Sequence, residues 1–335
     1  MKVLIYIGYQ KEDLTYDDFV QGNYIGGTEI LALKLAESLA TCGFQIYLGG
    51  NLTSGVHNNV TWLNLQECSS VKFDIAISAS YLHFIDSINA TLKYFWMHNT
   101  DYHGWYEGEW KYSDADLNDS RITGIIALTN WHKNQLIKDF KIKRPIHIIG
   151  NAIDRKSFGI EKQKIKNSFI YSSAADRGLY RLLLMWDDIR NEIPDATLNV
   201  FCPGYSTPDV NKWPEGVTYH GTVDQKTLHN WQQLSEYWLH PTDYEETYCI
   251  TALEMQYSRA IPITTDISAL SEVVNGGYLL PPGETNKEFI AIIKQLSKSN
   301  SIKGILREKG YQWSKQQSWN TRIIEWIQLI KRNTK

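Results

Sequence analysis

Short apolar runs alternate with amphipathic stretches along the first half of the chain. The first run, Val3 to Ile7, has the length and the continuous apolar character of a buried parallel strand. After a polar loop, apolar side chains recur at helical spacing from residue 28 to residue 40, with Thr28 as the expected N-cap and Gly43 as the expected stop. Repeated alternation of this kind is typical of a doubly wound parallel sheet with helices on both faces.

The alternation starts again in the second half of the chain. A polar, lysine-rich connector over residues 151–166 precedes a new apolar strand at 168–172. The last strand of this series ends near residue 280, and a helical tail follows from residue 286. Because 335 residues are more than one core usually serves, two α/β domains are expected. Ligands of such sheets bind beyond the carboxyl ends of the strands, so residues just after strands are the candidates for chemistry.

Composition and charge exclude several classes of protein. The formal net charge of −3 gives no reason to expect nucleic-acid binding. The four cysteines form no C-x-x-C pair and have no histidine cluster beside them, so neither a metal site nor a disulfide framework is expected. No apolar stretch reaches the length of a membrane span, and the N-terminus lacks the pattern of a signal peptide. We therefore expect a cytoplasmic protein without stable membrane insertion, with peripheral membrane association left open.

Glu246 and Glu254 are the acidic pair with the clearest chemical signal. A strand runs into a loop and then into a helix expected from about residue 248 to 257, so Glu246 lies at the helix entrance and Glu254 about two turns along. Eight residues at 100° each return to within about 80° of the starting face, so both carboxylates can face one ligand. On spacing alone, they could equally be a first-turn charge and a solvated helix residue. Free amides at this helix start would favour a phosphate. They belong to Thr247, Tyr248 and Cys249.

This E-x7-E spacing resembles the donor motif of retaining GT-B glycosyltransferases, in particular glycosyltransferase family 4, the glycosyl transferases group 1. Further motifs occur in the order that is typical of the family and span nearly the whole chain. They are the glycine-rich loop Gly26-Gly27-Thr28-Glu29, His98 after a strand, Asn151-Ala152-Ile153-Asp154 in the place of N-G-V-D, Arg177-Gly178 in the place of K-G, and Ala260-Ile261-Pro262-Ile263 in the place of G-x-P-V. Each motif is weak by itself, and their common order carries the resemblance.

The resemblance implies a GT-B fold, with two Rossmann-like domains facing across a cleft. An acceptor-side domain is expected over residues 1–155, a donor-side domain over 156–315, and a helix over 316–335 that packs back toward the first domain. The implied activity is transfer of a hexose from a UDP- or GDP-linked donor to a glycan or glycoconjugate acceptor, with retention of the anomeric configuration. The nucleotide sugar is a substrate, and no metal or other cofactor is implied.

The resemblance also implies roles for single residues. Glu246 is expected to bind hydroxyls of the donor sugar, Glu254 the ribose hydroxyls, and Arg177 the departing diphosphate. With His98 near the donor sugar, Glu246 and Arg177 are the expected catalytic residues. The other expected donor-binding residues are Gly26, Gly27, Ser172, Ser173, Gly178, Thr222, Val223, Thr247, Tyr248 and Cys249.

One position departs from the family pattern. The family usually carries an arginine six residues before the glycine of K-G, and here that residue is Ser172. Arg177 is then the evident cation for the diphosphate. A subset of the family has a similar Ser-Ser…Arg-Gly-Leu pattern, so the departure does not by itself indicate inactivity.

The aromatic and acidic stretch that follows His98, from Tyr102 to Trp110, is the candidate for the acceptor side. We expect Tyr102 and Trp105 to contact the acceptor, because a flat aromatic ring can pack on the C–H face of a sugar. A packed surface loop is the alternative interpretation of the same stretch.

Other interpretations apply to single residues and to the whole protein. A nicotinamide oxidoreductase would need G-x-G-x-x-G after the first strand, which Gly8-Tyr9-Gln10 does not provide. A non-catalytic nucleotide-sugar or carbohydrate-binding protein on the same fold stays open, whereas a nucleotide-sugar epimerase fits the motif order less well. The structural alternatives are a core histidine for His98, an ordinary loop for Gly26 and Gly27, and a surface ion pair of Arg177 with Asp176 or Asp187.

Overall fold

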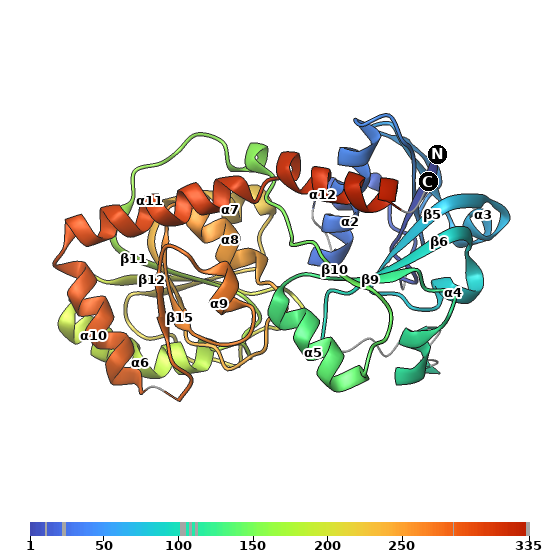
Figure 1. Cartoon of the computed structure of the whole chain (residues 1–335). Helices are drawn as coiled ribbons and strands as arrows, with labels where there is room; N and C mark the ends of the chain where they lie inside the picture. Colours follow the sequence, from blue (N-terminus) through green and yellow to red (C-terminus); the bar gives the residue numbers. More distant parts are fainter. Residues whose placement is uncertain are drawn as a thin grey trace. The chain divides into compact units, whose positions relative to one another are not determined.

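Strands and helices alternate along the chain and build an α/β architecture, as the computed structural model shows (Figure 1). The structure describes residues 1–10, 12–21, 25–100, 105–106, 109–110, 113–283 and 285–332. The chain divides into two compact units, Met1–Ala152 with Trp319–Lys335, and Ile153–Ser318. The predicted sheets of parallel strands are confirmed in both units.

The first unit is built on a sheet of eight strands. They are β1 (Lys2–Tyr6), β2 (Gln45–Gly49), β3 (Gly55–His57), β4 (Val60–Leu63), β5 (Lys72–Ala79), β6 (Asn89–Trp96), β9 (Gly124–Ala127) and β10 (Ile146–Ile148). Their order is β10-β9-β6-β5-β1-β2-β4-β3, and the edge pair β3–β4 is antiparallel. The chain leaves β1 toward one edge and returns to β5 on its other side, as in a doubly wound sheet. The apolar run of β1 is buried from Val3 to Tyr6, which explains its continuous hydrophobic character.

The remaining elements of the first unit surround this sheet. They are α1 (Tyr16–Gln21), α2 (Gly27–Ala40), α3 (Leu65–Ser70), α4 (Phe84–Ser87), α5 (Asn130–Phe140), α12 (Trp319–Arg332), η1 (Asp114–Asn118), and the strand pair β7 (Trp105–Tyr106) and β8 (Glu109–Trp110). The expected N-cap of α2 was wrong. Gly26, in an extended conformation, is the N-cap instead of Thr28, and no side chain caps this end. The helix ends at Ala40, and Gly43 with φ +83° lies in the turn that follows.

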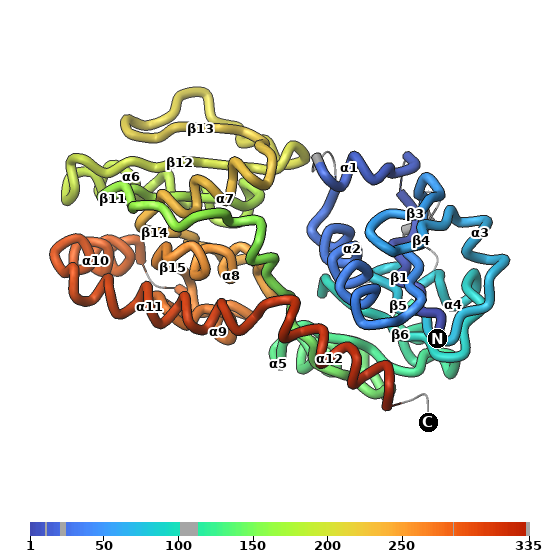
Figure 2. Tube along the Cα trace, turned by 90° about the horizontal axis from the view of Figure 1, so that it is seen from above, coloured from blue at the N-terminus to red at the C-terminus, as the bar shows by residue number. Residues whose placement is uncertain are grey.

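The second unit is built on a sheet of six strands. They are β11 (Ile165–Ser172), β12 (Thr197–Phe201), β13 (Val217–Gly221), β14 (Ser235–His240), β15 (Ile261–Thr265) and β16 (Tyr278–Leu280). All neighbours are parallel in the order β13-β12-β11-β14-β15-β16. Figure 2 labels the first five of these strands. The chain runs from β11 to one edge and returns to β14, so the strand order reverses between β11 and β14. The helices are η2 (Arg155–Phe158), α6 (Leu179–Glu192), α7 (Gln225–Leu234), α8 (Ile250–Tyr257), α9 (Leu270–Val273), α10 (Asn286–Ser297) and α11 (Asn300–Gln316).

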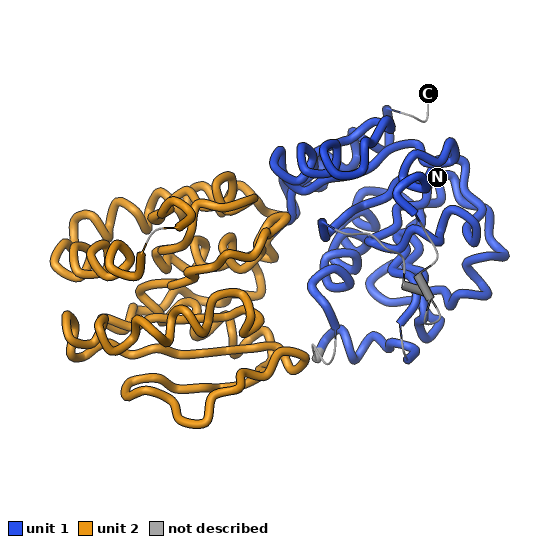
Figure 3. The backbone as a smooth tube through the Cα atoms, turned by 90° about the horizontal axis from the view of Figure 1, so that it is seen from below, with its two compact units in different colours: residues 1–152, 319–335 blue, residues 153–318 orange. Residues whose placement is uncertain are grey.

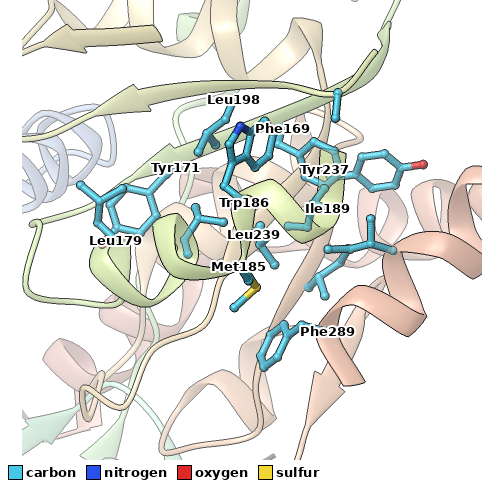
Figure 4. Packing of buried hydrophobic residues seen from close by; sticks show 14 of the residues in the cluster. Phe169, Tyr171, Leu179, Met185, Trp186, Ile189, Leu198, Tyr237, Leu239 and Phe289 are labelled. Atoms are coloured by element: carbon cyan, nitrogen blue, oxygen red, sulfur yellow. The ribbon is translucent and has the colours of Figure 1, made fainter. Parts of the chain in front are cut away.

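Large aromatic side chains fill the core of the second unit between the sheet and α6 (Figure 4). Phe169 meets the ring of Trp186 edge-on at 5.7 Å between centroids and stacks on Tyr237 at 4.9 Å. The indole N–H of Trp186 donates to the carbonyl oxygen of Glu215 at 2.9 Å, so its polar atom is satisfied while its ring is buried. This packing holds α6 rigidly on the sheet and fixes the loop that precedes the helix.

The chain passes from one unit to the other twice, after Ala152 and after Ser318 (Figure 3). Near both passages, the N–H of Ile153 donates to the carbonyl oxygen of Gln317 at 2.8 Å. The last helix, α12, then packs on the first unit, where the buried Trp326 meets the ring of Trp96 edge-on at 4.9 Å. Among the described helices, none combines the length and the apolar character that a membrane span requires.

We expect Trp326→Ala to lower the free energy of unfolding by about 3–5 kcal/mol, because it leaves a large cavity beside Trp96. Ile324→Ala on the same helix is the matched control, since Ile324 is 54% exposed. It should change stability by less than about 0.5 kcal/mol. Urea denaturation of both variants measures the difference, and equal midpoints would show that Trp326 does not anchor the helix.

Candidate functional site

The loops after β11 and β14 form the centre of the candidate site in the second unit. β11 ends at Ser172 and leads through a loop to α6, and β14 ends at His240 and leads through another loop to α8. These neighbouring strands flank the point where the strand order reverses. Loops that leave such a point in opposite directions open the place where α/β sheets bind their ligands.

Gly178 allows the two loops to approach each other closely. Its φ of +111° lies in the left-handed region, and a Cβ there would lie 2.7 Å from the carbonyl oxygen of Pro241 and 3.2 Å from the Cα of Thr242. Any other residue would therefore push the loops apart. The expected placement of Gly178 at the site has this physical reason, and the close approach brings Arg177 next to the second loop.

Arg177 and Glu246 form an ion pair, with 3.1 Å between Nη1 and Oε1. The guanidinium also lies over the ring of Tyr244, 4.0 Å from its centroid. The side chains of Arg177 and Glu246 are 29% and 12% exposed, so both charges are largely withdrawn from water. The alternative of a surface pair with Asp176 or Asp187 was wrong, because the ion pair joins Arg177 to Glu246.

The two charges of this pair respond differently to burial. Burial raises the pKa of Glu246, and the opposing charge of Arg177 and its hydrogen bond only partly offset this effect. Burial lowers the pKa of Arg177, but the charge of Glu246, together with Tyr244, outweighs it. Arg177 is therefore a permanent cation, and Glu246 is a carboxylate that protonates more readily than an exposed one.

Backbone hydrogen bonds hold the loop of Glu246 from behind. The N–H of Glu246 donates to Oγ of Ser268 at 2.9 Å, and its carbonyl oxygen accepts from the N–H of Ala269 at 3.1 Å. In the same loop, the N–H of Tyr244 donates to Oγ1 of Thr242 at 3.0 Å. The loop that positions Glu246 is thus fixed to the segment after β15.

The helix after this loop starts later than expected, at Ile250 and not at Tyr248. Cys249 is its N-cap and has φ +67°, an uncommon conformation for a residue other than glycine. The first-turn amides are therefore those of Ile250 and Thr251, while Thr247, Tyr248 and Cys249 precede the helix and have largely buried side chains. This backbone conformation costs free energy in a residue other than glycine, so it persists only where the surrounding structure enforces it. Such residues are often found at functional sites.

Glu254 lies on α8 and faces α7. Its Oε2 accepts from Nε2 of Gln232 at 3.0 Å, and its Oε1 lies 3.5 Å from Nε2 of His229. The side chain of Glu254 is only 15% exposed, so the alternative of a solvated helix residue was wrong. Sequence reasoning missed both partners. The only signal was their spacing of three residues, which places them on one face of a helix, and both lie on α7.

The other expected donor residues of this unit follow β11 and β13. Ser172 is 7% exposed, and its Oγ has no hydrogen-bond partner among the described residues. Its carbonyl oxygen accepts from Oγ1 of Thr251 at 3.5 Å, which links β11 to α8. Ser173 is partly buried in the loop that follows. Beyond β13, Thr222 is exposed and donates to the carbonyl oxygen of Cys202 at 3.1 Å, and Val223 is partly buried.

His98 lies in the first unit, after β6. Its ring is 4.3 Å from that of Trp96 between centroids, and 8% of the residue is exposed. Burial, with a smaller contribution from the charge of His132, lowers the pKa of His98 to about 3. The imidazole is therefore neutral near pH 7 and can exchange hydrogen bonds, but not a full charge, with a ligand.

Gly26 and Gly27 precede α2 in the same unit. A Cβ on Gly26 would lie 2.6 Å from Oε2 of Glu29, whereas a Cβ on Gly27 would have open space around it. Burial raises the pKa of Glu29, although its hydrogen bond from Gln10 opposes this. Since the carboxylate of Glu29 ends a flexible side chain that could shift, close packing requires a glycine at neither position.

The structure brings together Arg177, Gly178 and Glu246 at one place in the second unit. His98, Gly26 and Gly27 belong to the first unit, and their part in a common site stays a prediction. Tyr102 lies outside the described residues, as does the side chain of Trp105, so the acceptor assignment also stays a prediction. Within the described residues, no three His, Cys, Asp or Glu side chains are grouped so that they could hold a metal ion.

The comparisons with known proteins concern the fold and part of the second unit. Residues 168–299 match the model of the family Glycosyl transferases group 1. Sucrose-phosphate synthase from Thermosynechococcus elongatus is similar in structure, with a TM-score of 0.72, 13% identity, and 99% of this chain and 98% of that chain covered. Anabaena Alr3699/HepE in complex with UDP-glucose has a TM-score of 0.72 at 12% identity, with 99% and 100% covered. WaaG, a glycosyltransferase involved in lipopolysaccharide biosynthesis, has a TM-score of 0.68 at 10% identity, with 98% and 99% covered.

No curated protein matches the chain in sequence. The structural likeness nevertheless covers almost the full length of both chains in these cases. The predicted GT-B fold and the predicted resemblance to glycosyl transferases group 1 are therefore confirmed. The matched segment contains Arg177, Gly178, Glu246 and Glu254.

We expect Gly178→Ala to lower the free energy of unfolding by about 2 kcal/mol, because the new Cβ meets Pro241 and the positive φ disfavours alanine. Gly304→Ala in α11 is the matched control in the same unit, since nothing lies within 4 Å of its Cβ position. It should stabilise the protein by about 0.5–1 kcal/mol through helix propensity. Urea denaturation measures both, and a Gly178→Ala variant as stable as the parent would contradict the close approach of the loops.

Proposed function

We propose that this chain, with its glycosyl transferases group 1 segment on a GT-B fold, transfers a sugar from a nucleotide-sugar donor to a glycan or glycoconjugate acceptor. The observation that carries the proposal is the largely buried Arg177–Glu246 pair after β11 and β14, in the matched segment and beside the start of α8. One member of the pair suits a diphosphate and the other suits sugar hydroxyls. The diphosphate of a nucleotide sugar and the sugar attached to it would thus meet complementary groups at one place.

Arg177 is the group that stabilises the departing diphosphate in this proposal. Its planar guanidinium can donate two parallel hydrogen bonds to phosphate oxygens, and the ring of Tyr244 and the carboxylate of Glu246 hold it in one orientation. A hydrogen-bond donor that is already oriented before the reaction stabilises the charge that develops on the diphosphate without any reorganisation. The amides of Ile250 and Thr251 belong to the first turn of α8, and the N-terminal end of a helix favours an anion such as a phosphate.

Glu246 binds the donor sugar. Arg177 occupies only part of the acceptor capacity of its carboxylate, because each carboxylate oxygen has two lone pairs. The remaining lone pairs can accept hydrogen bonds from sugar hydroxyls. Glu254 binds the ribose hydroxyls, and the two glutamates thereby align the donor along α8.

The reaction breaks the bond between the anomeric carbon and the bridging oxygen of the diphosphate, and the electron pair stays on that oxygen. The acceptor hydroxyl oxygen forms the new bond to the anomeric carbon from the same face, and its proton passes to the departing diphosphate. This course retains the anomeric configuration without a covalent sugar on the protein, and the charge of Arg177 lets it proceed without a metal ion. The transition state resembles an oxocarbenium ion, as in glycoside hydrolysis.

The donor is a UDP- or GDP-linked hexose in this proposal. The similar structures include Anabaena Alr3699/HepE in complex with UDP and glucose and with UDP-glucose, which supports a UDP-linked donor. The acceptor side belongs to the first unit, with Tyr102 and Trp105 as the proposed contacts and His98 near the donor sugar.

A non-catalytic sugar-nucleotide binding protein on the same fold is the second candidate. Ser172 favours it, because the family usually places an arginine there and the serine supplies no second cation. Transfer or hydrolysis of a donor by the purified protein separates the two candidates. Binding without either reaction would favour the second.

A panel of UDP-, GDP-, ADP- and TDP-linked sugars should contain one donor that stabilises the protein. At 100 times its dissociation constant, the matching donor should add about 2.7 kcal/mol to the free energy of unfolding. Thermal denaturation with each compound measures this, with the free sugars as controls. A panel without any shift would contradict nucleotide-sugar binding.

With a competent donor, Glu246→Ala should lower kcat/KM by at least about 100-fold, because a preorganised contact to the reacting sugar is lost. Glu245→Ala is the matched control, since Glu245 is the exposed neighbour in the same loop. It should keep kcat/KM within about twofold of the parent. Near-normal turnover of the Glu246 variant would remove this residue from the site.

A further inference from the structure

His229 and Gln232 form a second polar cluster with Glu254, and the proposed reaction assigns these two residues no role. It joins α8 to α7 through His229 and Gln232, which contact different oxygens of the Glu254 carboxylate. The side chains of His229 and Glu254 are 6% and 15% exposed. A polar group buried to this extent is retained at a cost in desolvation, so its placement calls for a reason.

The surroundings of His229 decide which of its nitrogens carries a proton. Nδ1 lies 3.3 Å from the carbonyl oxygen of Ser157, which can only accept, so Nδ1 is the donor of this contact. Nε2 then faces the carboxylate of Glu254 at 3.5 Å, an ion-pair distance that is slightly long for a strong hydrogen bond. A neutral ring with its proton on Nδ1 would direct the lone pair of Nε2 at a negative charge. The arrangement therefore favours the doubly protonated imidazolium.

The ring of His229 is also held in place. It stacks on Phe158 with 4.0 Å between the centroids and 17° between the planes. The carbonyl oxygen of Phe158 in turn accepts a hydrogen bond from the side chain of Gln233, which follows His229 by one helical turn on α7. The stacked ring cannot swing away from Glu254 without breaking the contact between η2 and α7.

His229 and Gln232 use only half of the acceptor capacity of Glu254. A carboxylate has about four lone-pair sites, and each of the two partners takes one. One lone pair therefore remains on each oxygen among the described contacts. Two acceptors on one rigid group suit two neighbouring hydroxyls, such as the 2′- and 3′-hydroxyls of a ribose.

We propose that His229 is a positioning residue, which orients Glu254 for the ribose diol of the donor and makes donor affinity depend on the protonation of its imidazole. The inference rests on the proposed function, because it takes Glu254 as the ribose ligand. It adds the residue that holds this ligand in place.

The charges around His229 set the direction of the pH dependence. Glu254 on α8 and Asp154 beside η2 are the negative charges that act on it. The amine of Lys164, just before β11, donates to the carbonyl oxygen of Gln232, and burial lowers the pKa of this lysine. Burial lowers the pKa of His229, but the hydrogen bond and charge of Glu254 outweigh this effect, so the pKa is raised above its ordinary value of 6.5. The ion pair is therefore complete below that ordinary value and is lost as the pH rises through the raised pKa.

Isothermal titration calorimetry with UDP-glucose and with GDP-mannose tests the proposal. The ligand that binds more tightly is then used for all the variants. The phosphates of these diesters do not titrate between pH 6 and pH 8, and uracil and guanine lose their ring protons only at higher pH, so a change in affinity within this range reports on the protein. The parent should bind about fivefold more weakly at pH 8 than at pH 6. His229→Asn, which keeps a donor for Ser157 but removes Nε2, should bind about tenfold more weakly than the parent at pH 6 and show no pH dependence.

The same donor without its ribose 2′-hydroxyl separates positioning from general stability. If His229 acts through Glu254 and the diol, the loss on His229→Asn should shrink to about twofold with the 2′-deoxy donor. An equal loss with both donors overturns the proposal, because it would indicate a structural role. His229→Gln, whose amide replaces Nε2 as a neutral donor, should recover part of the affinity at every pH. It also guards against a poorly folded Asn variant.

His220 provides the matched control. It stacks on Phe201 at 4.5 Å in the same unit, but its Nε2 lies 2.9 Å from the amide oxygen of Asn199 and not beside a carboxylate. His220→Asn should leave the pH profile of donor binding unchanged. Parent-like binding by His229→Asn at every pH overturns this inference alone. Parent-like binding by Glu254→Ala, or no binding of either donor by the parent, overturns the donor assignment as well.

Discussion

The close approach of the loops after β11 and β14 is the constraint on which the rest of the site depends. Gly178 meets the backbone of Pro241 and Thr242 with no room for a side chain, and its positive φ turns the chain into α6 at that point. Arg177 is thereby carried to Glu246, although 69 residues separate them in sequence. The contact between two backbones, more than the attraction of two charges, brings the pair together.

Burial then decides how the two glutamates behave. Each has a carboxylate with a fixed partner from another element, Arg177 for Glu246, and His229 with Gln232 for Glu254. In a largely desolvated place such contacts are stronger than in water, and an unpaired charge would be costly. Both carboxylates keep lone pairs for a ligand while their orientation is set by the protein. Such an arrangement is preorganised for a ligand with hydroxyl groups.

The two units differ in how much of their role can be read from them. The second unit carries the matched family segment, the ion pair and the start of α8 in one place. The first unit carries a neutral, buried His98 and a glycine loop packed against Glu29. The whole chain is 10–13% identical to the similar structures, a level at which the fold persists while specificity-determining contacts change. The candidate site is therefore better defined in the second unit than in the first.

The sequence by itself determined most of the helices and strands and the candidate residues, because hydrophobic periodicity and turn-forming residues are local properties of a chain. The apolar runs of β1 and β11, the helical spacing of α2, and the spacing of Glu246 and Glu254 needed no distant contact. The helix starts were less predictable. Gly26 replaced Thr28 as an N-cap, and the left-handed Cys249 moved the start of α8 to Ile250.

Only the tertiary structure decided which groups meet. The partners of Glu254 come from 22 and 25 residues earlier in the chain, and the hydroxyls of Ser268 and Thr242 hold the loop of Glu246. No local pattern encodes such pairs, because they follow from strand order and from the packing of α7 on α8. The sequence therefore determined which residues are candidates for the chemistry, and the fold determined their partners and orientation through burial and packing.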